Sequence, residues 1–322
     1  MSQRPAKSPQ PISVPYQPPR LAAANGIELC YDIFGDDDAE PMVMIMGLGA
    51  QMIHWDDDFC RELAARGFRV IRFDNRDIGL SSKLTGGKQF TLFELAKLRF
   101  LGTPLTAPYR LCDMAADTVG LLDVLGIASA HVVGASMGGM IAQEIAIEHP
   151  ERVRSLVSIM STTGNPRLPQ PGRAVAVMLM QPQPVTYDAF VARFKQTWLF
   201  LRVGRFPEDE ARDADRAERT FARGLHPAGV GRQLRAILAS GSRKERLAAV
   251  TAPTLVIHGK LDPLVHPAGG RDTAASIPGA ELLMIDGMGH ALPISMWTRV
   301  IDAIAKHASG AKAQHAVKRR VG

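Results

Sequence analysis

The segment Gly134-Ala135-Ser136-Met137-Gly138 places a serine two residues after one glycine and two residues before another. An apolar run at 131–133 predicts a strand before it, and residues 137–149 predict a helix after it. So sharp a strand-to-helix turn strains its central residue and requires small residues two positions away. The five residues alone could simply form a turn, but in this context they indicate a nucleophilic serine above the N-terminus of a helix.

A serine hydroxyl becomes a good nucleophile only when a neighbouring base takes its proton. The predicted base is His290, in the glycine-flanked loop DGMGHALP that follows the strand-like run ELLMID. His54 and His266 are its main competitors among the nine histidines. His266 lies only four residues from Asp262, so the two would share one loop and reach the serine poorly.

A carboxylate is also needed to hold the imidazole in its productive tautomer. The predicted acid is Asp262, in GKLDPLV after the strand-like run TLVIHG, although a loop aspartate before Pro263 could equally be a turn residue. The other position expected for an acid, after the run at 155–160, reads Ser-Thr-Thr and offers no carboxylate. This absence favours Asp262.

Acyl transfer requires N–H donors for the oxyanion that forms on the attacked carbonyl. The backbone N–H groups of Met137 and Leu48 are the predicted donors, Leu48 in the loop MGLGAQMIHW after a buried strand. In that loop Gly47 and Gly49 could also begin a dinucleotide fingerprint, but its third glycine position is Met52 and no acidic ribose partner follows. With no P-loop and no His/Glu metal cluster, the sequence predicts that no cofactor and no metal is required.

The composition fits an ordinary globular protein, with 322 residues, 46% hydrophobic and 22% charged. No apolar run approaches the roughly 20 residues that span a bilayer, and the N-terminus lacks the apolar region of a secretory signal. Part of the net charge of +6 lies in the tail AKAQHAVKRRVG, without aromatic residues between the basic ones. We therefore expect a cytoplasmic protein with a small-molecule substrate and neither nucleic acid nor membrane as a partner.

The candidate residues must be positioned by a sheet, because each follows a predicted strand and ligands bind beyond the carboxyl ends of parallel strands. Asn25-Gly26 lies between two strand-like runs and predicts a hairpin. Strands and helices then alternate, which predicts a mostly parallel α/β sheet with helices on both faces. The expected strands are 42–46, 68–74, 131–133, 155–160, 254–259 and 281–286, and the expected helices are 55–67, 113–126, 137–149 and 297–308.

The alternation stops near residue 164 and resumes near residue 251, with helical composition between. The simplest division is one α/β domain with an inserted helical cap. Six prolines in the first 19 residues favour a disordered arm there. The predicted parts are the arm 1–19, the core 20–163 and 251–309, the cap 164–250 and a basic flexible tail 310–322.

Over roughly residues 20–310 the chain resembles the α/β-hydrolase superfamily, in the order Ser, Asp, His and in the segments FDNRDIGLSS, TLVIHGKLDPLV and GMGHALP. Within it, the segment from MGLGAQ to GLSS is most similar to bacterial carboxylesterases related to the aclacinomycin methylesterases. Two positions depart from the pattern. Met46 replaces the histidine that supports the oxyanion loop in many members, and Asp77 stands where glycine is usual.

The resemblance implies a serine carboxylesterase that passes through an acyl-enzyme on Ser136, with Asp262 as acid, His290 as base and Leu48 and Met137 as oxyanion donors. Serine at the elbow excludes the dehalogenases and epoxide hydrolases, which use aspartate, and the dienelactone hydrolases, which use cysteine. Other serine hydrolases remain open: C–C bond hydrolases, lactonases and perhydrolases. A non-catalytic ligand sensor on the same fold is a further alternative.

Overall fold

The computed structural model describes residues 12–86, 105–172 and 186–321, together with positions 175, 178, 181 and 184. Its centre is an eight-stranded sheet in the order β1-β2-β4-β3-β5-β6-β7-β8. The strand β2 is antiparallel to β1 and β4, and every other pair is parallel. The predicted α/β class with a mostly parallel sheet is therefore confirmed. The strands are β1 (Tyr16–Ala24), β2 (Ile27–Phe34), β3 (Glu40–Ile45), β4 (Phe68–Phe73), β5 (Ala130–Ala135), β6 (Val153–Ile159), β7 (Thr254–Gly259) and β8 (Glu281–Ile285).

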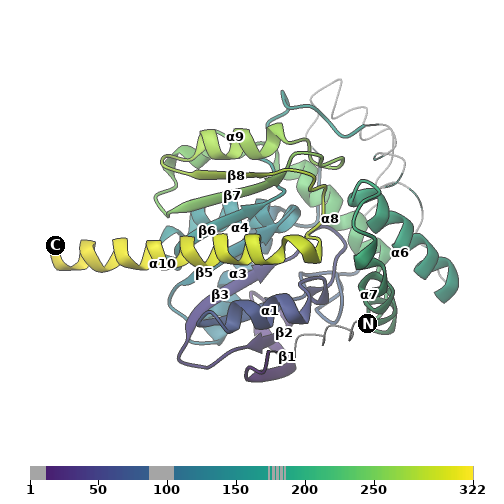
Figure 1. Ribbon diagram of the computed structural model, residues 1–322, viewed down its shortest axis with the longest axis horizontal. Coiled ribbons are helices and arrows are strands. Elements are labelled where there is room, and N and C mark those ends of the chain that lie inside the picture. The colour runs from purple at the N-terminus through teal and green to yellow at the C-terminus, as the bar shows by residue number, and fades with distance from the viewer. Residues whose placement is uncertain are drawn as a thin grey trace, which may run out of the picture.

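Helices cover the sheet on both faces (Figure 1). The α-helices are α1 (Asp57–Ala64), α3 (Leu111–Val124), α4 (Met137–Glu148), α6 (Tyr187–Leu201), α7 (Glu210–Ala222), α8 (Pro227–Ser240), α9 (Ala268–Ser276) and α10 (Trp297–Val321). Short 3-10 helices are η1 (Met52–His54), η2 (Pro150–Arg152), η3 (Pro207–Asp209), η4 (Arg246–Ala249) and η5 (Ile294–Met296). The strands and helices expected from the sequence occur within about three residues of their predicted ends, except at the end of α10.

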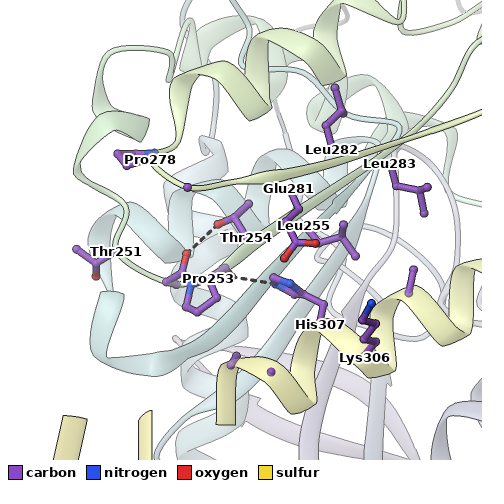
Figure 2. A pocket seen from close by; sticks show the side chains of 15 residues that line it. Thr251, Pro253, Thr254, Leu255, Pro278, Glu281, Leu282, Leu283, Lys306 and His307 are labelled. Carbon is purple, nitrogen blue, oxygen red and sulfur yellow. Dashed lines mark hydrogen bonds between the residues drawn. The ribbon is translucent and has the colours of Figure 1, made fainter. Parts of the chain in front are cut away.

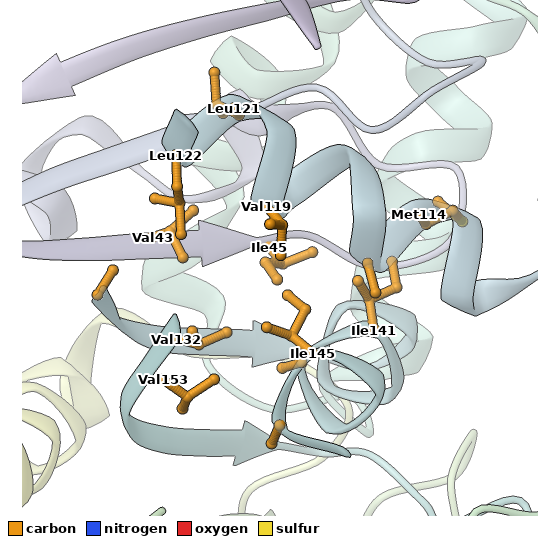
Figure 3. Packing of buried hydrophobic residues seen from close by; sticks show 14 of the residues in the cluster. Val43, Ile45, Met114, Val119, Leu121, Leu122, Val132, Ile141, Ile145 and Val153 are labelled. Atoms are coloured by element: carbon orange, nitrogen blue, oxygen red, sulfur yellow. The ribbon is translucent and has the colours of Figure 1, made fainter. Parts of the chain in front are cut away.

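The alternation of side chains along β3 divides the core into two layers. Val43 and Ile45 pack on one face with α3 and α4, while Met42 and Met44 pack on the other with α1 and α10. Figure 3 shows the first layer, in which apolar side chains of α3 and α4 meet those of β3 and β5. Both faces are buried, which explains why β3 reads as a continuous apolar run. This packing fixes α4, and with it the turn at Ser136.

The predicted hairpin at Asn25-Gly26 is confirmed: the two residues join β1 to β2 with φ of 49° and 76°. The predicted disordered arm extends too far, because β1 begins at Tyr16. Pro18 and Pro19 are tolerated since β1 is an edge strand whose register with β2 shifts between Gln17 and Arg20. Residues 1–11 of the arm lie outside the described residues.

Where the sequence predicts a flexible tail from residue 310, α10 continues to Val321. The segment after Gly310 is rich in alanine, lysine and arginine, which are good helix formers. It extends a helix already nucleated at Trp297, so no new nucleation is needed. In Figure 1 this end of α10 projects beyond the body of the molecule, on the side opposite α6 and α7.

Helices α6, α7 and α8 occur between β6 and β7, where the sequence predicts the inserted helical segment. They contact the loops that follow the parallel strands: Gln233 of α8 pairs with Gly49, and Arg232 of α8 pairs with Asp77. Among the described parts of the chain, none of the helices is both long and apolar enough to cross a membrane.

Candidate active site

Ser136 stands at the turn between β5 and α4 with φ 56° and ψ −120°, a backbone conformation that is strained for a residue with a side chain. Glycine is required at positions 134 and 138 because backbone atoms of other residues approach closely there. A Cβ atom at Gly134 would collide with the carbonyl of Gly138, and one at Gly138 would collide with that of Ile45. The sterically tight turn predicted from the sequence is present.

The structure brings Ser136, His290 and Asp262 together at the carboxyl ends of β5, β8 and β7. His290 Nδ1 lies 2.7 Å from Asp262 Oδ2, and His290 Nε2 lies 3.0 Å from Ser136 Oγ. A carboxylate only accepts hydrogen bonds, so Nδ1 carries the proton and Nε2 is free to accept from the serine hydroxyl. The main chain fixes the histidine loop as well, because the N–H of His290 donates to the carbonyl of Leu201 at 2.8 Å.

Asp262 is buried and held as a carboxylate. Burial alone would raise its pKa, but the opposing effects of His290 and His258 lower that pKa well below its usual value. Its Oδ1 accepts from the backbone N–H groups of Leu264 at 2.9 Å and Val265 at 2.8 Å. A charged acceptor of this kind can orient the imidazole and stabilise the imidazolium that forms when His290 takes a proton.

His258 is a neighbour that the sequence analysis missed, since a histidine inside a strand has the ordinary interpretation of a core residue. It is fully buried at the end of β7, with Nε2 3.3 Å from Asp262 Oδ2 and 2.9 Å from the carbonyl of Val265. The spacing of four residues to Asp262 is visible in the sequence, but it does not reveal that both side chains meet.

The proposed oxyanion loop follows β3 and lies against the nucleophile. A Cβ atom at Gly47 would lie 3.1 Å from Ser136 Cβ and 3.6 Å from its Oγ, so glycine keeps the approach to the hydroxyl open. Leu48 follows Gly47 directly, and Met137 begins α4, where the first N–H groups of a helix have no intrahelical acceptor. Both predicted donors are thus in segments adjacent to Ser136.

Two side-chain amides support this loop, in which Met46 stands in place of the histidine that the resemblance implies. Asn75 Nδ2 donates to the carbonyl of Met46 at 2.9 Å. Gln233 of α8 accepts from the N–H of Gly49 at 2.9 Å, while its Nε2 donates to the carbonyl of Arg76 at 2.9 Å. Gln233 is fully buried, and nothing in the sequence near residue 233 identifies it as a partner of the loop.

The position where glycine is usual is occupied by Asp77 with φ 73°, which explains why glycine suits it. Asp77 accepts from Arg232 at 2.8 Å and from Tyr109 at 2.8 Å. Burial raises the pKa of Asp77, but these bonds outweigh it and the pKa is lowered. Asp77 in place of glycine therefore adds an ion pair between α8 and the loop after β4.

The other candidate histidines do not pair with the serine. His54 Nε2 lies 3.2 Å from Thr220 Oγ1, and His266 Nδ1 accepts from the N–H of Ala268 at 3.1 Å. Within the described residues, no group of three or more His, Cys, Asp or Glu side chains is arranged to hold a metal ion.

A cavity of about 210 Å³ opens onto Ser136 and His290. Its wall combines Leu48 and other residues of the oxyanion loop with side chains of α6 and α7, among them Trp198 and Arg216. A larger cavity of about 630 Å³ lies at the opposite, amino ends of β7 and β8 (Figure 2). None of Ser136, Asp262 and His290 lines the larger cavity, so the smaller one is the candidate active site.

Comparison with known proteins found relatives along nearly the whole chain. Rhodomycin D methylesterase DauP of Streptomyces sp. (strain C5) is 30% identical over 316 residues, which cover 91% of this chain and 99% of the relative. The crystal structure of the enol-lactonase from Burkholderia xenovorans LB400 has a TM-score of 0.65 at 24% identity and covers 91% of this chain and 100% of that one. Esterase RhEst1 from Rhodococcus sp. ECU1013 has a TM-score of 0.70 at 19% identity and covers 90% and 98% of the two chains.

The two solved structures are too distant in sequence to show more than the fold. A family model described as alpha/beta hydrolase fold matches residues 40–295, which include the serine, the aspartate and the histidine of the site. The chain therefore belongs to the alpha/beta hydrolase family and is a hydrolase.

Proposed function

We propose that the protein is a carboxylic ester hydrolase that acts through an acyl-enzyme on Ser136. The observation that carries the proposal is the continuous line of hydrogen bonds from Asp262 through His290 to Ser136, at 2.7 and 3.0 Å. The similarity to a rhodomycin D methylesterase along nearly the whole chain supports esters as the substrate class. No step of the proposed reaction requires a metal or a cofactor.

In the proposed mechanism His290 Nε2 takes the proton of Ser136 as Oγ attacks the ester carbonyl. The negative charge that develops on the carbonyl oxygen is stabilised by the N–H groups of Leu48 and Met137. The imidazolium, stabilised by Asp262, then protonates the leaving alcohol. Water attacks the acyl-enzyme with His290 again as base, and Ser136 is regenerated.

Helices α6, α7 and α8 form the proposed cap over this site. Its support is that Thr197, Trp198 and Arg216 line the cavity that contains Ser136. A cap in this position would exclude bulk water from the ester and strengthen the electrostatic interactions inside. Residues that line the cavity from the cap would contact the substrate beyond the reacting ester.

The test is turnover of p-nitrophenyl butyrate together with trapping of the nucleophile. We expect the wild type to release p-nitrophenol and a fluorophosphonate to add once per chain, with peptide mass spectrometry finding the adduct on Ser136. Ser136→Ala should lose both the turnover and the adduct. Ser161→Ala changes a buried serine whose hydroxyl donates to the backbone carbonyl of Ser136, and this variant should keep the adduct. An adduct on another residue, or full turnover by Ser136→Ala, would reject the proposal.

A further inference from the structure

A second histidine, His258, lies beside the proposed acid at the oxygen that faces the proposed base. Its Nε2 is 3.3 Å from Asp262 Oδ2, and the same Oδ2 is 2.7 Å from His290 Nδ1. The other oxygen, Oδ1, accepts from the backbone N–H groups of Leu264 and Val265. The proposed mechanism uses Asp262 and His290 but gives His258 no part.

Hydrogen bonding places the ring proton of His258 on Nε2. This nitrogen lies 2.9 Å from the carbonyl of Val265, and a carbonyl only accepts, so Nε2 is the donor. Nδ1 is buried and has no hydrogen-bond partner within the described residues. A second proton on Nδ1 would leave a buried charge with an unpaired donor, which is costly. The ring is therefore neutral, with its N–H at the end that faces the oxygens of Val265 and Asp262.

Packing against α9 restrains the same ring. A Cβ atom at Gly270 would lie 2.6 Å from His258 Nδ1 and 2.8 Å from its Cγ, so any larger residue there would displace the imidazole or the helix. His258 is also fully buried at the end of β7. The imidazole is thus held in one orientation by close packing as well as by its hydrogen bond.

The N–H of His258 supports both oxygens of the buried carboxylate. It places a positive dipole beside Oδ2, and burial raises the pKa of Asp262 while His290 and His258 lower it, with the net pKa below its usual value. Its bond to the carbonyl of Val265 closes the turn 262–265, whose N–H groups hold Oδ1. Loss of this N–H would free the turn and remove one of the contacts that restrain the carboxylate.

We infer that His258 is a positioning residue that acts through Asp262, because its Nε2–H holds the turn 262–265 and fixes Oδ2 against His290 Nδ1. The inference rests on the proposed function, since it assigns a further role in the same hydrolytic site. A carboxylate that is less well fixed orients the imidazole less well, and His290 then takes the proton of Ser136 less readily. The effect belongs to the chemical step, so it lowers kcat more than it changes KM.

Two substitutions form a matched pair, because glutamine and methionine have side chains of equal length and only glutamine carries an N–H donor. We expect His258→Met to lower kcat on p-nitrophenyl butyrate by about 10- to 100-fold, with KM changed less than about threefold. His258→Gln should stay within about threefold of the wild type, because its amide N–H replaces that of the ring. His131→Met is the control for loss of a buried strand histidine: His131 is fully buried in β5, pairs with Ser155 Oγ at 2.8 Å and should keep its kcat.

A double-mutant cycle tests whether His258 acts through Asp262. In the Asp262→Asn background the carboxylate is already lost, so His258→Met should lower kcat by less than about twofold further. A loss as large as in the wild-type background would show an independent structural effect and overturn the inference. Failure of a folded His258→Gln variant to recover kcat would also overturn it, since the N–H would then not be the group that matters.

The protonation of the ring can be measured in the wild type without any activity assay. Nitrogen-15 NMR of histidine-labelled protein distinguishes a protonated ring nitrogen from an unprotonated one, and the signals of His258 are those missing in His258→Gln. We expect a proton on Nε2 and none on Nδ1 at neutral pH. A proton on Nδ1 instead would overturn the inference even if His258→Met does not fold, because the N–H would no longer face Asp262.

The outcomes separate this inference from the proposed function. If the wild type hydrolyses p-nitrophenyl butyrate and a folded His258→Met variant keeps its kcat, the inference is overturned and the esterase proposal stands. If the wild type hydrolyses no ester, the proposed function fails and the role given to His258 fails with it.

Discussion

Gln233, on a helix of the proposed cap, supports the proposed oxyanion loop of the core. We therefore predict that a change at Gln233 affects catalysis. Replacement by methionine, Gln233→Met, keeps the length of the side chain and removes both of its hydrogen bonds. The N–H of Gly49 and the carbonyl of Arg76 then lose partners that are each 2.9 Å away. Each buried backbone group left unpaired costs roughly 1–3 kcal/mol.

The effect on catalysis follows from the position of Gly49, which is next to Leu48. If the loop relaxes, the N–H of Leu48 is displaced from the developing oxyanion. Loss of one oxyanion donor lowers kcat by about 10²–10³, and partial misplacement costs less. We therefore expect Gln233→Met to lower kcat by about 10- to 100-fold on p-nitrophenyl butyrate, with KM changed less than about threefold, because the ground-state ester does not need the donor.

The matched control is Gln143→Met, which removes another fully buried glutamine. Gln143 accepts from Arg243 at 3.0 Å and donates to Ser158 at 3.4 Å, and neither partner belongs to the proposed oxyanion loop. Thermal unfolding should show a loss of stability in both variants, whereas steady-state kinetics should show the fall in kcat only for Gln233→Met. An unchanged kcat in Gln233→Met, or equal falls in the two variants, would refute the role given to Gln233.

Three further predictions concern the site. Ser136→Ala or His290→Ala should lower kcat by about 10⁴–10⁶ with the circular dichroism spectrum unchanged, and the double variant should be hardly slower than either; additive losses would contradict a joint role. Leu48 next to the carbonyl should make ethyl esters much better substrates than tert-butyl esters of the same acid, and Leu48→Gly should narrow the difference; if it does not, the cap sets alcohol selectivity. Because the pKa of Asp262 is lowered on folding, its carboxylate stabilises the folded state above the unfolded pKa of 3.8 and loses that contribution as pH falls below it, so denaturant unfolding between about pH 5 and 2 should be steeper in pH for wild type than for Asp262→Asn. Parallel pH profiles would contradict this assignment.

The strands and the turn at Ser136 could be predicted because local sterics determine them. Apolar runs such as the one in β3 mark strands buried on both faces, and the glycines around Ser136 are imposed by contacts within a few residues or with the adjacent strand. The structure at the two ends of the chain is harder to predict from the sequence. Proline counts predict an extended arm but do not show that Pro18 and Pro19 fit an edge strand at a register shift. Composition likewise does not show that α10 continues through the basic tail.

The residues that support the site could not be predicted, because their partners are distant in sequence or hidden by an ordinary interpretation. Gly49 and Gln233 are 184 residues apart, and only the docking of α8 onto the core brings them together. His258 is four residues from Asp262, but β7 is buried along its whole length, so a histidine there looks like any core residue. Local patterns identify the candidate catalytic groups, since each needs a specific backbone turn. The groups that hold them need only a hydrogen-bond donor or acceptor in the right place, which many residue types on many elements could provide.

This difference applies to the proposed oxyanion loop, where Met46 stands in place of the histidine that the resemblance implies. The loop needs its backbone held, and the Met46 side chain has no hydrogen-bond donor and only a weakly accepting sulfur. Asn75 of the core donates a hydrogen bond to the carbonyl of Met46, and Gln233 of α8 accepts one from the N–H of Gly49. Because one of these two supports belongs to α8, any movement of that helix away from the core would also release the loop that carries Leu48. The position of the proposed cap and the position of the proposed oxyanion donor Leu48 are therefore physically linked in this protein.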